Sequence, residues 1–142
     1  MTVTKLTLKV LAIDDDPAMT ELLTLLLKTH GFKVLTANTG EDGLAIARKD
    51  SPDVVILDLM MPGMDGWQVC DQLRTFSNVP ILVFSALDNP GMVAGALDAG
   101  ADDYLVKPVP SGVLIAHLNK LTRRASMNNG NKFIPHTVPL SV

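Results

Sequence analysis

The stretch VVILDLMMPGMDG at residues 54–66 decides the fold of this chain. Four apolar residues run without a break up to Asp58, and a loop rich in methionine, proline and glycine follows them. A short and continuous apolar run is typical of a strand buried on both faces, as strands in parallel sheets are. The stretch therefore predicts a strand at 54–57, a carboxylate at its carboxyl end, and a helix at about 65–74.

The same unit recurs on both sides of this stretch. We predict strands at 9–13, 33–37, 81–84 and 104–106, and helices at about 16–30, 39–49, 89–99 and 111–123. The strand at 33–37 is the most polar, which favours an edge position. Because crossovers between parallel strands are right-handed, the expected fold is α/β: a doubly wound five-stranded parallel sheet in the order 2-1-3-4-5, a flavodoxin-like three-layer sandwich.

Composition excludes several classes of protein. The 142 residues are 47% hydrophobic, enough for the core of one domain. No apolar run approaches the ~18 residues of a membrane-spanning helix, and the first residues lack a signal peptide's apolar core, so we expect a cytoplasmic protein without membrane contact. The single cysteine, Cys70, excludes an internal disulfide and a cysteine-built zinc site. The net charge of −3 argues against direct nucleic-acid binding.

Charge and composition both change near the end of the chain. Residues 1–103 hold seven basic and all fifteen acidic residues, whereas residues 104–142 hold five basic residues and no acidic one. The two ends should therefore face different partners, or each other. The last residues are rich in glycine, asparagine and proline. We predict one domain over 1–124, followed by a flexible C-terminal tail or truncated linker over 125–142.

Polar residues stand at the ends of four predicted strands: Asp14 with Asp15, Asp58, Ser85 and Lys107. Ligands bind at the carboxyl ends of strands in such sheets, near the point where the strand order reverses, so these side chains should meet at one edge. Three carboxylates repel one another unless a cation joins them, and oxygen ligands suit Mg²⁺. With one ammonium and one hydroxyl added, the set suits a phosphoryl group.

Four segments together carry a resemblance to a known family: IDDDP at 13–17, LDLMMPGMDG at 57–66, FSA at 84–86 and DYLVKP at 103–108. In order and spacing they resemble the receiver domain of two-component response regulators over about residues 9–124. The resemblance implies that Asp58 accepts a phosphoryl group from a sensor histidine kinase or phosphotransfer protein, or from a small phosphodonor. Such a receiver catalyses only its own phosphorylation and dephosphorylation, and it signals through the face formed by its fourth helix, fifth strand and fifth helix.

The resemblance also implies a role for each site residue. Asp15 and Asp58 would bind Mg²⁺ directly with the backbone carbonyl of Met60, and Asp14 would bind it through water. Lys107, joined by a cis bond to Pro108, would pair with the phosphoryl group. Ser85 would swing to a phosphoryl oxygen, and Tyr104 would turn inward behind it.

Two further positions of the family flank the path of the water that hydrolyses the phosphoryl group. They are occupied here by Met60 and Leu87, and neither side chain binds a water strongly. We therefore predict normal phosphorylation with slow dephosphorylation.

Two other functions compete with the signalling switch. A Mg²⁺-dependent phosphohydrolase would use Asp58 as nucleophile, but such enzymes place a second acid two residues later, where this chain has Met60. A flavin-binding module would need a loop after the first strand that cradles phosphate, and three aspartates there would repel it. Both alternatives are disfavoured.

The residues say less about which output domain or protein the receiver controls. Arg123-Arg124 and the string GADDYLVKP resemble receivers that precede winged-helix DNA-binding domains, so an output domain or a downstream protein is expected as partner. Receivers of that group dimerise through charged pairs, but Gly112, Val113, His117 and Asn119 depart from the group's usual charged residues. We expect a monomer or a weak, phosphorylation-dependent homodimer.

Overall fold

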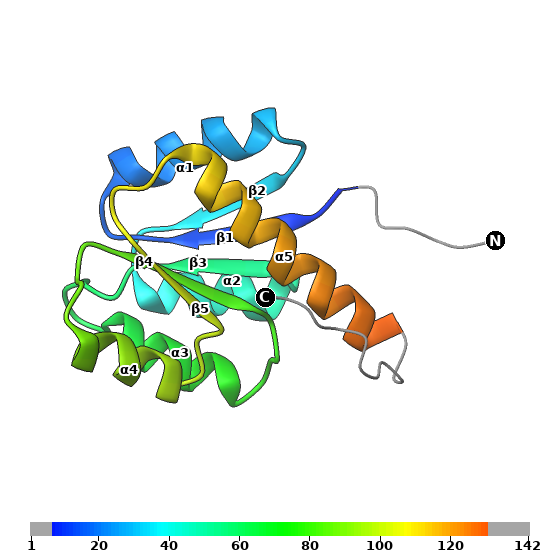
Figure 1. Cartoon of the computed structure of the whole chain (residues 1–142). Coiled ribbons are helices and arrows are strands. Elements are labelled where there is room, and N and C mark those ends of the chain that lie inside the picture. The colour runs from blue at the N-terminus through cyan, green and yellow to red at the C-terminus, as the bar shows by residue number, and fades with distance from the viewer. Residues whose placement is uncertain (1–6, 131–142) are drawn as a thin grey trace.

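The computed structural model describes residues 7–130, with side chains through Ala125. Strands and helices alternate through the described chain (Figure 1). In chain order they are β1 (Lys9–Ile13), α1 (Pro17–Thr29), β2 (Lys33–Ala37), α2 (Gly40–Asp50), β3 (Val54–Leu57), α3 (Gly66–Arg74), β4 (Ile81–Ser85), α4 (Pro90–Asp98), β5 (Asp103–Val106) and α5 (Ser111–Gly130). No helix within the described part of the chain has the length and apolarity needed to cross a membrane.

The five strands form one parallel sheet in the order β2-β1-β3-β4-β5, as predicted. The more polar β2 lies at an edge, and its Lys33 and Thr36 are exposed. The reversal of strand order lies between β1 and β3, which pair from Val10 with Val54 to Ile13 with Leu57. The carboxyl ends of these two strands are therefore adjacent.

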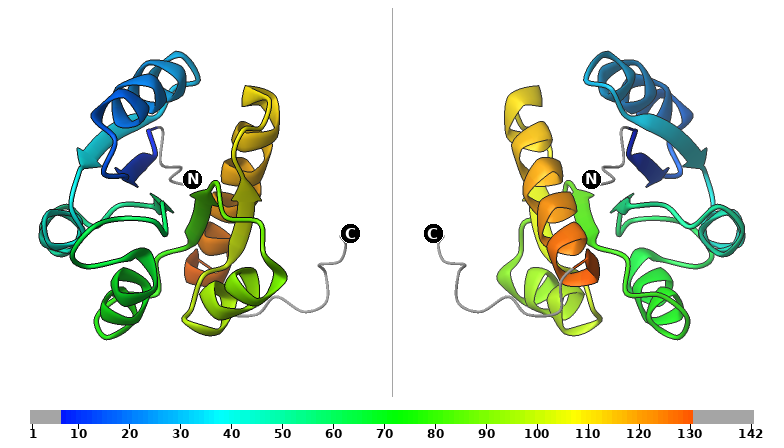
Figure 2. Two further views of the ribbon diagram at one scale, coloured as in Figure 1. Left: turned by 90° about the vertical axis from the view of Figure 1, so that its left-hand side faces the viewer. Right: turned by 90° about the vertical axis from the view of Figure 1, so that its right-hand side faces the viewer.

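Helices cover both faces of the sheet, so the molecule has three layers (Figures 1 and 2). One face packs against α1 and α5, and the other packs against α2, α3 and α4. Successive residues of a strand point to opposite faces, so Leu11 and Ile13 belong to one core, and Val10 and Ala12 belong to the other. The continuous apolar sequences of β1, β3 and β4 have this cause, because each of these three strands is buried on both faces.

Side-chain caps fix where the helices begin. Asp16 accepts a hydrogen bond from the Ala18 amide at the start of α1, directly before Pro17. Asp65 and Gln68 form a capping box at the start of α3, with each side chain accepting from the other residue's backbone amide. These caps satisfy amides that have no partner inside the helix. The site described below is therefore flanked by helices with fixed starts.

The last helix is longer than the sequence pattern predicts. We expected it to end near Arg123, with a tail from residue 125, but α5 continues to Gly130. The prediction was wrong at residues 125–130 because the segment ASMNN contains two good helix formers, Ala125 and Met127, and neither proline nor glycine, so nothing in it stops a helix already formed. The rest of the predicted tail, residues 131–142, lies outside the described residues.

Candidate functional site

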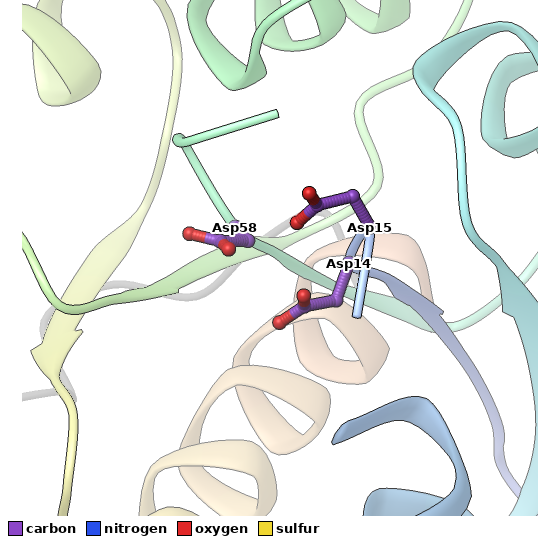
Figure 3. Close-up of side chains that lie close together, drawn as sticks. All are labelled: Asp14, Asp15 and Asp58. Atoms are coloured by element: carbon purple, nitrogen blue, oxygen red, sulfur yellow. The ribbon is translucent and has the colours of Figure 1, made fainter. Parts of the chain in front are cut away.

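Three carboxylates meet where β1 and β3 end (Figure 3). Asp14 and Asp15 follow β1, and Asp58 follows β3. One oxygen from each of the three carboxylates lies within 4.8 Å of the other two. Asp14 and Asp58 are buried, whereas Asp15 is exposed. The predicted cluster is therefore present, with its exposed member open to solvent.

Asp14 is held from several directions. One carboxylate oxygen accepts a hydrogen bond of 3.0 Å from the Asp16 amide, and the other accepts one of 2.7 Å from the Lys107 ammonium. Its own amide donates to the Ala37 carbonyl of β2 at 3.1 Å, directly beyond the paired residues of β1 and β2. Asp14 is thus a buried carboxylate whose position is fixed by three hydrogen bonds.

Lys107 brings the positive charge of the site from the end of β5. Its ammonium lies 2.7 Å from Asp14, 3.6 Å from Asp58 and 5.4 Å from the centre of the Phe84 ring. Its amide donates to the Ser85 carbonyl at 2.8 Å, and the bond to Pro108 is cis, as expected. By formal charge, one ammonium beside three carboxylates leaves an excess of two negative charges, which a single divalent cation would balance.

Burial raises the pKa of Asp58 above its ordinary value of 3.8, because water no longer stabilises the charged carboxylate. The Lys107 ammonium and the Met60 amide, which donates to Asp58 at 3.2 Å, oppose this shift. The nearby Asp14 carboxylate adds to it, and the Ser85 hydroxyl opposes it. Asp58 is thus a partly desolvated carboxylate whose charge depends on a few named partners.

The loop after Asp58 is closely packed against its own backbone. Gly63 has a φ of 77°, a conformation that favours glycine. A side chain at Gly66 would come within 2.6 Å of the Asp58 carbonyl oxygen and of the Leu59 Cα atom. The Gly66 amide also donates to the Leu59 carbonyl at 3.1 Å. The start of α3 therefore abuts the residue that the sequence predicts as the phosphoryl acceptor.

Ser85, Leu87 and Tyr104 form a second linked group beside Asp58. Ser85 is fully buried at the end of β4, and its hydroxyl oxygen accepts from the Leu87 amide at 3.4 Å. The Tyr104 hydroxyl, from β5, donates to the Leu87 carbonyl at 2.7 Å. Burial raises the pKa of Tyr104, and the Ser85 hydroxyl opposes that shift. A change at Ser85 thus has a short route to Tyr104 through Leu87.

Two polar residues near the site were missed at the level of sequence. Asn38 follows β2 and donates to the Asp14 carbonyl, and Thr20 of α1 accepts from the same amide nitrogen. The predicted site included the polar residues that follow β1, β3, β4 and β5 but not the one that follows β2. The same strand-end rule, applied to the strand at 33–37, would have found Asn38.

Other candidate residues lie away from this edge. Nδ1 of His117, on α5, lies 2.5 Å from a carboxylate oxygen of Asp103 on β5. His30 is exposed at the end of α1, and Cys70 is fully buried in the core. Burial raises the pKa of Cys70 to about 12, so its thiol stays protonated and unreactive at neutral pH.

The donor set at the strand ends fits Mg²⁺. The donors are carboxylate oxygens, which are the ligands of hard cations, and no cysteine or histidine stands in the cluster. Mg²⁺ keeps several waters and is bound through few protein carboxylates, which suits a group with one open member. The sequence-based assignment of the metal ligands, including the Met60 carbonyl, stays a prediction.

Comparison with known proteins gives one consistent result. Residues 10–119 match the family model of the response regulator receiver domain. The chain is 43% identical over 114 residues, 80% of its length, to the transcriptional regulatory protein AfsQ1 of Streptomyces coelicolor, and 45% identical over 118 residues, 82% of its length, to the response regulator MprA of Mycobacterium leprae. These matches cover 51% and 52% of the two relatives, so the chain spans about half of their length.

The comparison with solved structures gives the same family. The BeF3-activated N-terminal receiver domain of Klebsiella pneumoniae RstA superposes with a TM-score of 0.78 at 33% identity, covering 81% of this chain and 98% of that one.

Proposed function

The chain belongs to the family of response regulator receiver domains, and we propose that it is a phosphorylation-controlled signalling switch with Asp58 as phosphoryl acceptor. A sensor histidine kinase or a phosphotransfer protein in the cytoplasm donates the phosphoryl group. The observation that carries the proposal is the meeting of Asp58 with Asp14, Asp15 and Lys107 at the edge of the sheet. Asp58 alone among the three acids is buried at the end of a strand and also faces the ammonium without a direct hydrogen bond to it.

In the proposed reaction, a carboxylate oxygen of Asp58 attacks the phosphorus of the donor. The new O–P bond forms as the bond between phosphorus and the donor's histidine nitrogen breaks, and the electron pair of that bond stays with the imidazole. No general base is needed, because the carboxylate is the nucleophile and carries no proton to remove. Lys107 then pairs with the phosphoryl oxygens, which relieves part of the charge that Asp14 and Asp58 place there.

Mg²⁺ is the proposed cofactor: Asp15, Asp58 and the carbonyl of Met60 would hold it directly, and Asp14 would hold it through water. When bound, it would neutralise charge on the transferred phosphoryl group. Each of these groups lies at the ends of β1 and β3 or in the loop after β3, and the excess of two negative charges supports a divalent ion.

Signal output is proposed to begin at Ser85. Its hydroxyl moves to a phosphoryl oxygen and gives up the contact with the Leu87 amide. The Tyr104 hydroxyl then releases the Leu87 carbonyl, and the ring turns inward toward the space beside Ser85. Because Tyr104 lies on β5, the change reaches the face formed by α4, β5 and α5, where a partner reads it.

The proposed receiver comprises the chain through α5, beyond the boundary at residue 124 that the sequence pattern predicts, and does not itself bind nucleic acid. AfsQ1 is named as a transcriptional regulator and is about twice as long as the matched region. We infer that an output domain or a downstream protein is the partner of the switch. The domain acts as a monomer or as a weak homodimer that forms on phosphorylation.

The proposal is tested by labelling with acetyl phosphate at varied Mg²⁺. Labelling should require Mg²⁺, and Mg²⁺ at ten times its dissociation constant should stabilise the fold by about 1.4 kcal/mol. Asp15→Ala should remove both effects, because it deletes the open carboxylate of the cluster. Asp71→Ala, an exposed acid on α3, is the matched control and should retain both. Labelling of the wild-type chain at an unchanged rate in EDTA would refute the metal-assisted mechanism.

The lifetime of the phosphoryl group is a separate prediction. Met60 is 54% exposed beside the acceptor, and Leu87 is half-buried above Ser85. Neither side chain can hold an attacking water in line with the phosphorus, so dephosphorylation should be slow. Met60→Asn combined with Leu87→Glu should speed the decay by about tenfold, equivalent to about 1.4 kcal/mol of improved positioning.

Decay of the acyl phosphate, followed after removal of the donor, measures this effect. The control carries the same two changes on α4, Met92→Asn with Leu97→Glu, at exposed positions. If Met60 and Leu87 only fill space, the first double variant decays no faster than this control, and the prediction fails.

A further inference from the structure

We propose that Asn38 is a positioning residue for the metal site, and that it sets the direction of the Asp15 carboxylate by holding the peptide group between Asp14 and Asp15. The inference rests on the proposed function, because it assumes that Asp15 is a Mg²⁺ ligand. Asn38 contacts neither the cation nor the phosphoryl group. Its effect would pass through the backbone.

The Asn38 side chain joins three segments of the chain. Its amide nitrogen donates a hydrogen bond of 2.8 Å to the Asp14 carbonyl oxygen and one of 3.2 Å to the hydroxyl oxygen of Thr20. Thr20 is buried in α1, and its hydroxyl donates to the Pro17 carbonyl at 3.2 Å. The Thr20 proton is thus used, and only its lone pairs face Asn38. A carbonyl oxygen can only accept, so the nitrogen of Asn38 and not its oxygen must face Asp14.

The Asp14 carbonyl belongs to the peptide group that leads into Asp15. The orientation of that planar group places the nitrogen and Cα atoms of Asp15, and so limits the directions in which the Asp15 side chain can leave the backbone. Asp14 does not depend on Asn38 to the same degree, because its amide and both carboxylate oxygens have their own partners. Asp15 differs, since none of the side chains and amides described between residues 7 and 130 donates to its carboxylate. Its placement therefore depends on the backbone that Asn38 holds.

A purely structural role for Asn38 would be to tie the loop after β2 to the rest of the domain. That loop is already tied, because β1 and β2 pair along their whole length and the Asp14 amide extends the pairing to Ala37. The fold therefore does not depend on the contact between Asn38 and the Asp14 carbonyl, whereas the position of the predicted metal ligand Asp15 does. The two roles predict different measurements: a structural role lowers the melting temperature, and a positioning role weakens Mg²⁺ binding.

The test is a titration of the whole chain with Mg²⁺ alone, followed by the NMR shifts of the amides of residues 14–16. Asn38→Ala should weaken Mg²⁺ binding by about tenfold, the lower end of the range for residues that orient metal ligands. The rate of labelling by acetyl phosphate at saturating Mg²⁺ should stay within about twofold of wild type, because the reacting groups are intact once the ion is bound. The Mg²⁺ concentration for half-maximal rate should rise with the dissociation constant.

A second pair of variants tests the same chain of contacts from α1. Thr20→Val keeps the shape but removes the oxygen that anchors Asn38, and should weaken Mg²⁺ binding by about threefold. Thr20→Ser keeps the hydroxyl and should bind Mg²⁺ as wild type does. Asn119→Ala, an exposed asparagine on α5, is the matched control for Asn38→Ala and should also be unchanged.

The outcomes separate this inference from the function on which it rests. If wild type binds Mg²⁺ and is labelled, but Asn38→Ala binds Mg²⁺ equally well, the positioning role is refuted and the proposed function stands. The positioning role is also refuted if Asn38→Ala lowers the saturated rate as much as the affinity. If wild type itself neither binds Mg²⁺ nor is labelled, the proposed function fails first. Should Asn38→Ala not fold, the comparison of Thr20→Val with Thr20→Ser decides alone.

Discussion

Replacing Asp58 with asparagine should reduce labelling by acetyl phosphate, or by a cognate kinase, by at least about 1,000-fold while the fold is retained. The amide keeps the size and shape of the carboxylate, and it can still accept the hydrogen bond from the Met60 amide. It carries no nucleophilic oxygen anion, so the O–P bond cannot form at the wild-type rate. Intact-protein mass spectrometry after incubation with donor and Mg²⁺ measures the loss.

The same substitution has a second and opposite effect on stability. Burial raises the pKa of Asp58 above 3.8 in the folded state, so the folded chain binds more protons than the unfolded chain between that value and the raised one. The contribution of Asp58 to the stability of the wild type therefore falls as the pH rises through this window. The amide in Asp58→Asn carries no charge to desolvate, so without metal the variant should be more stable than wild type at neutral pH.

The pH dependence makes the test specific. The two chains should have equal stability well below pH 3.8, where Asp58 is protonated in both the folded and the unfolded state. The advantage of the variant should grow toward neutral pH and shrink when Mg²⁺ is added, because only the wild type gains the full cation site. Persistent labelling of the variant at the wild-type rate would contradict the assignment. So would a stability difference between variant and wild type that becomes less favourable to the variant as the pH rises from acid to neutral.

The fold was predictable because the three inner strands, β1, β3 and β4, are buried on both faces. The run VLAI in β1 and the run VVIL in β3 are continuous apolar sequences, and each contributes side chains to the cores on both faces of the sheet. The starts of α1 and α3 were predictable from Asp16 and Asp65, whose short carboxylates cap the helices. The end of α5 was not, because helix termination depends on the balance of small propensities when no proline or glycine intervenes.

The site was predictable to the extent that strand ends define it. Asp14, Asp58 and Lys107 follow apolar strands, and the strand order alone brings them together. Asn38 was missed because it follows β2, whose sequence is the most polar of the five strands and so gives the weakest strand-end signal. Sequence also could not distinguish Asp15, which is exposed, from its buried neighbour Asp14, since that depends on how the backbone turns after β1.

Arg74 was also beyond sequence reasoning, because its partners are distant in the chain. The guanidinium donates to the Gly100 carbonyl from two nitrogens, at 3.1 and 2.8 Å, and to the Val79 and Ser77 carbonyls at 2.8 and 3.2 Å. It also forms an ion pair of 3.0 Å with Asp102, which accepts from the Ile81 amide. One side chain thus joins the end of α3 to the starts of β4 and β5, at the edge of the sheet opposite the carboxylates.

Arg74→Ala should therefore lower the free energy of unfolding by about 3 kcal/mol, because several half-buried carbonyls lose a charged donor at once. In a domain of this size the melting temperature should fall by roughly 10 °C. Arg48→Ala is the matched control: its guanidinium lies 4.4 Å from the centre of the Phe76 ring, and its loss should cost no more than about 1 kcal/mol. Urea denaturation measures both.

The contrast between the two substitutions tests whether the edges of the sheet have separate roles. Below its melting temperature, Arg74→Ala should be labelled nearly as fast as wild type, since Asp58 and Lys107 stand at the other end of the strands. Asp58→Asn should show the reverse, with stability kept and labelling lost. Equal losses of stability in Arg74→Ala and Arg48→Ala would show that the guanidinium contacts add nothing beyond an exposed arginine. A large loss of labelling in folded Arg74→Ala would show that the two edges are coupled through β4 and β5.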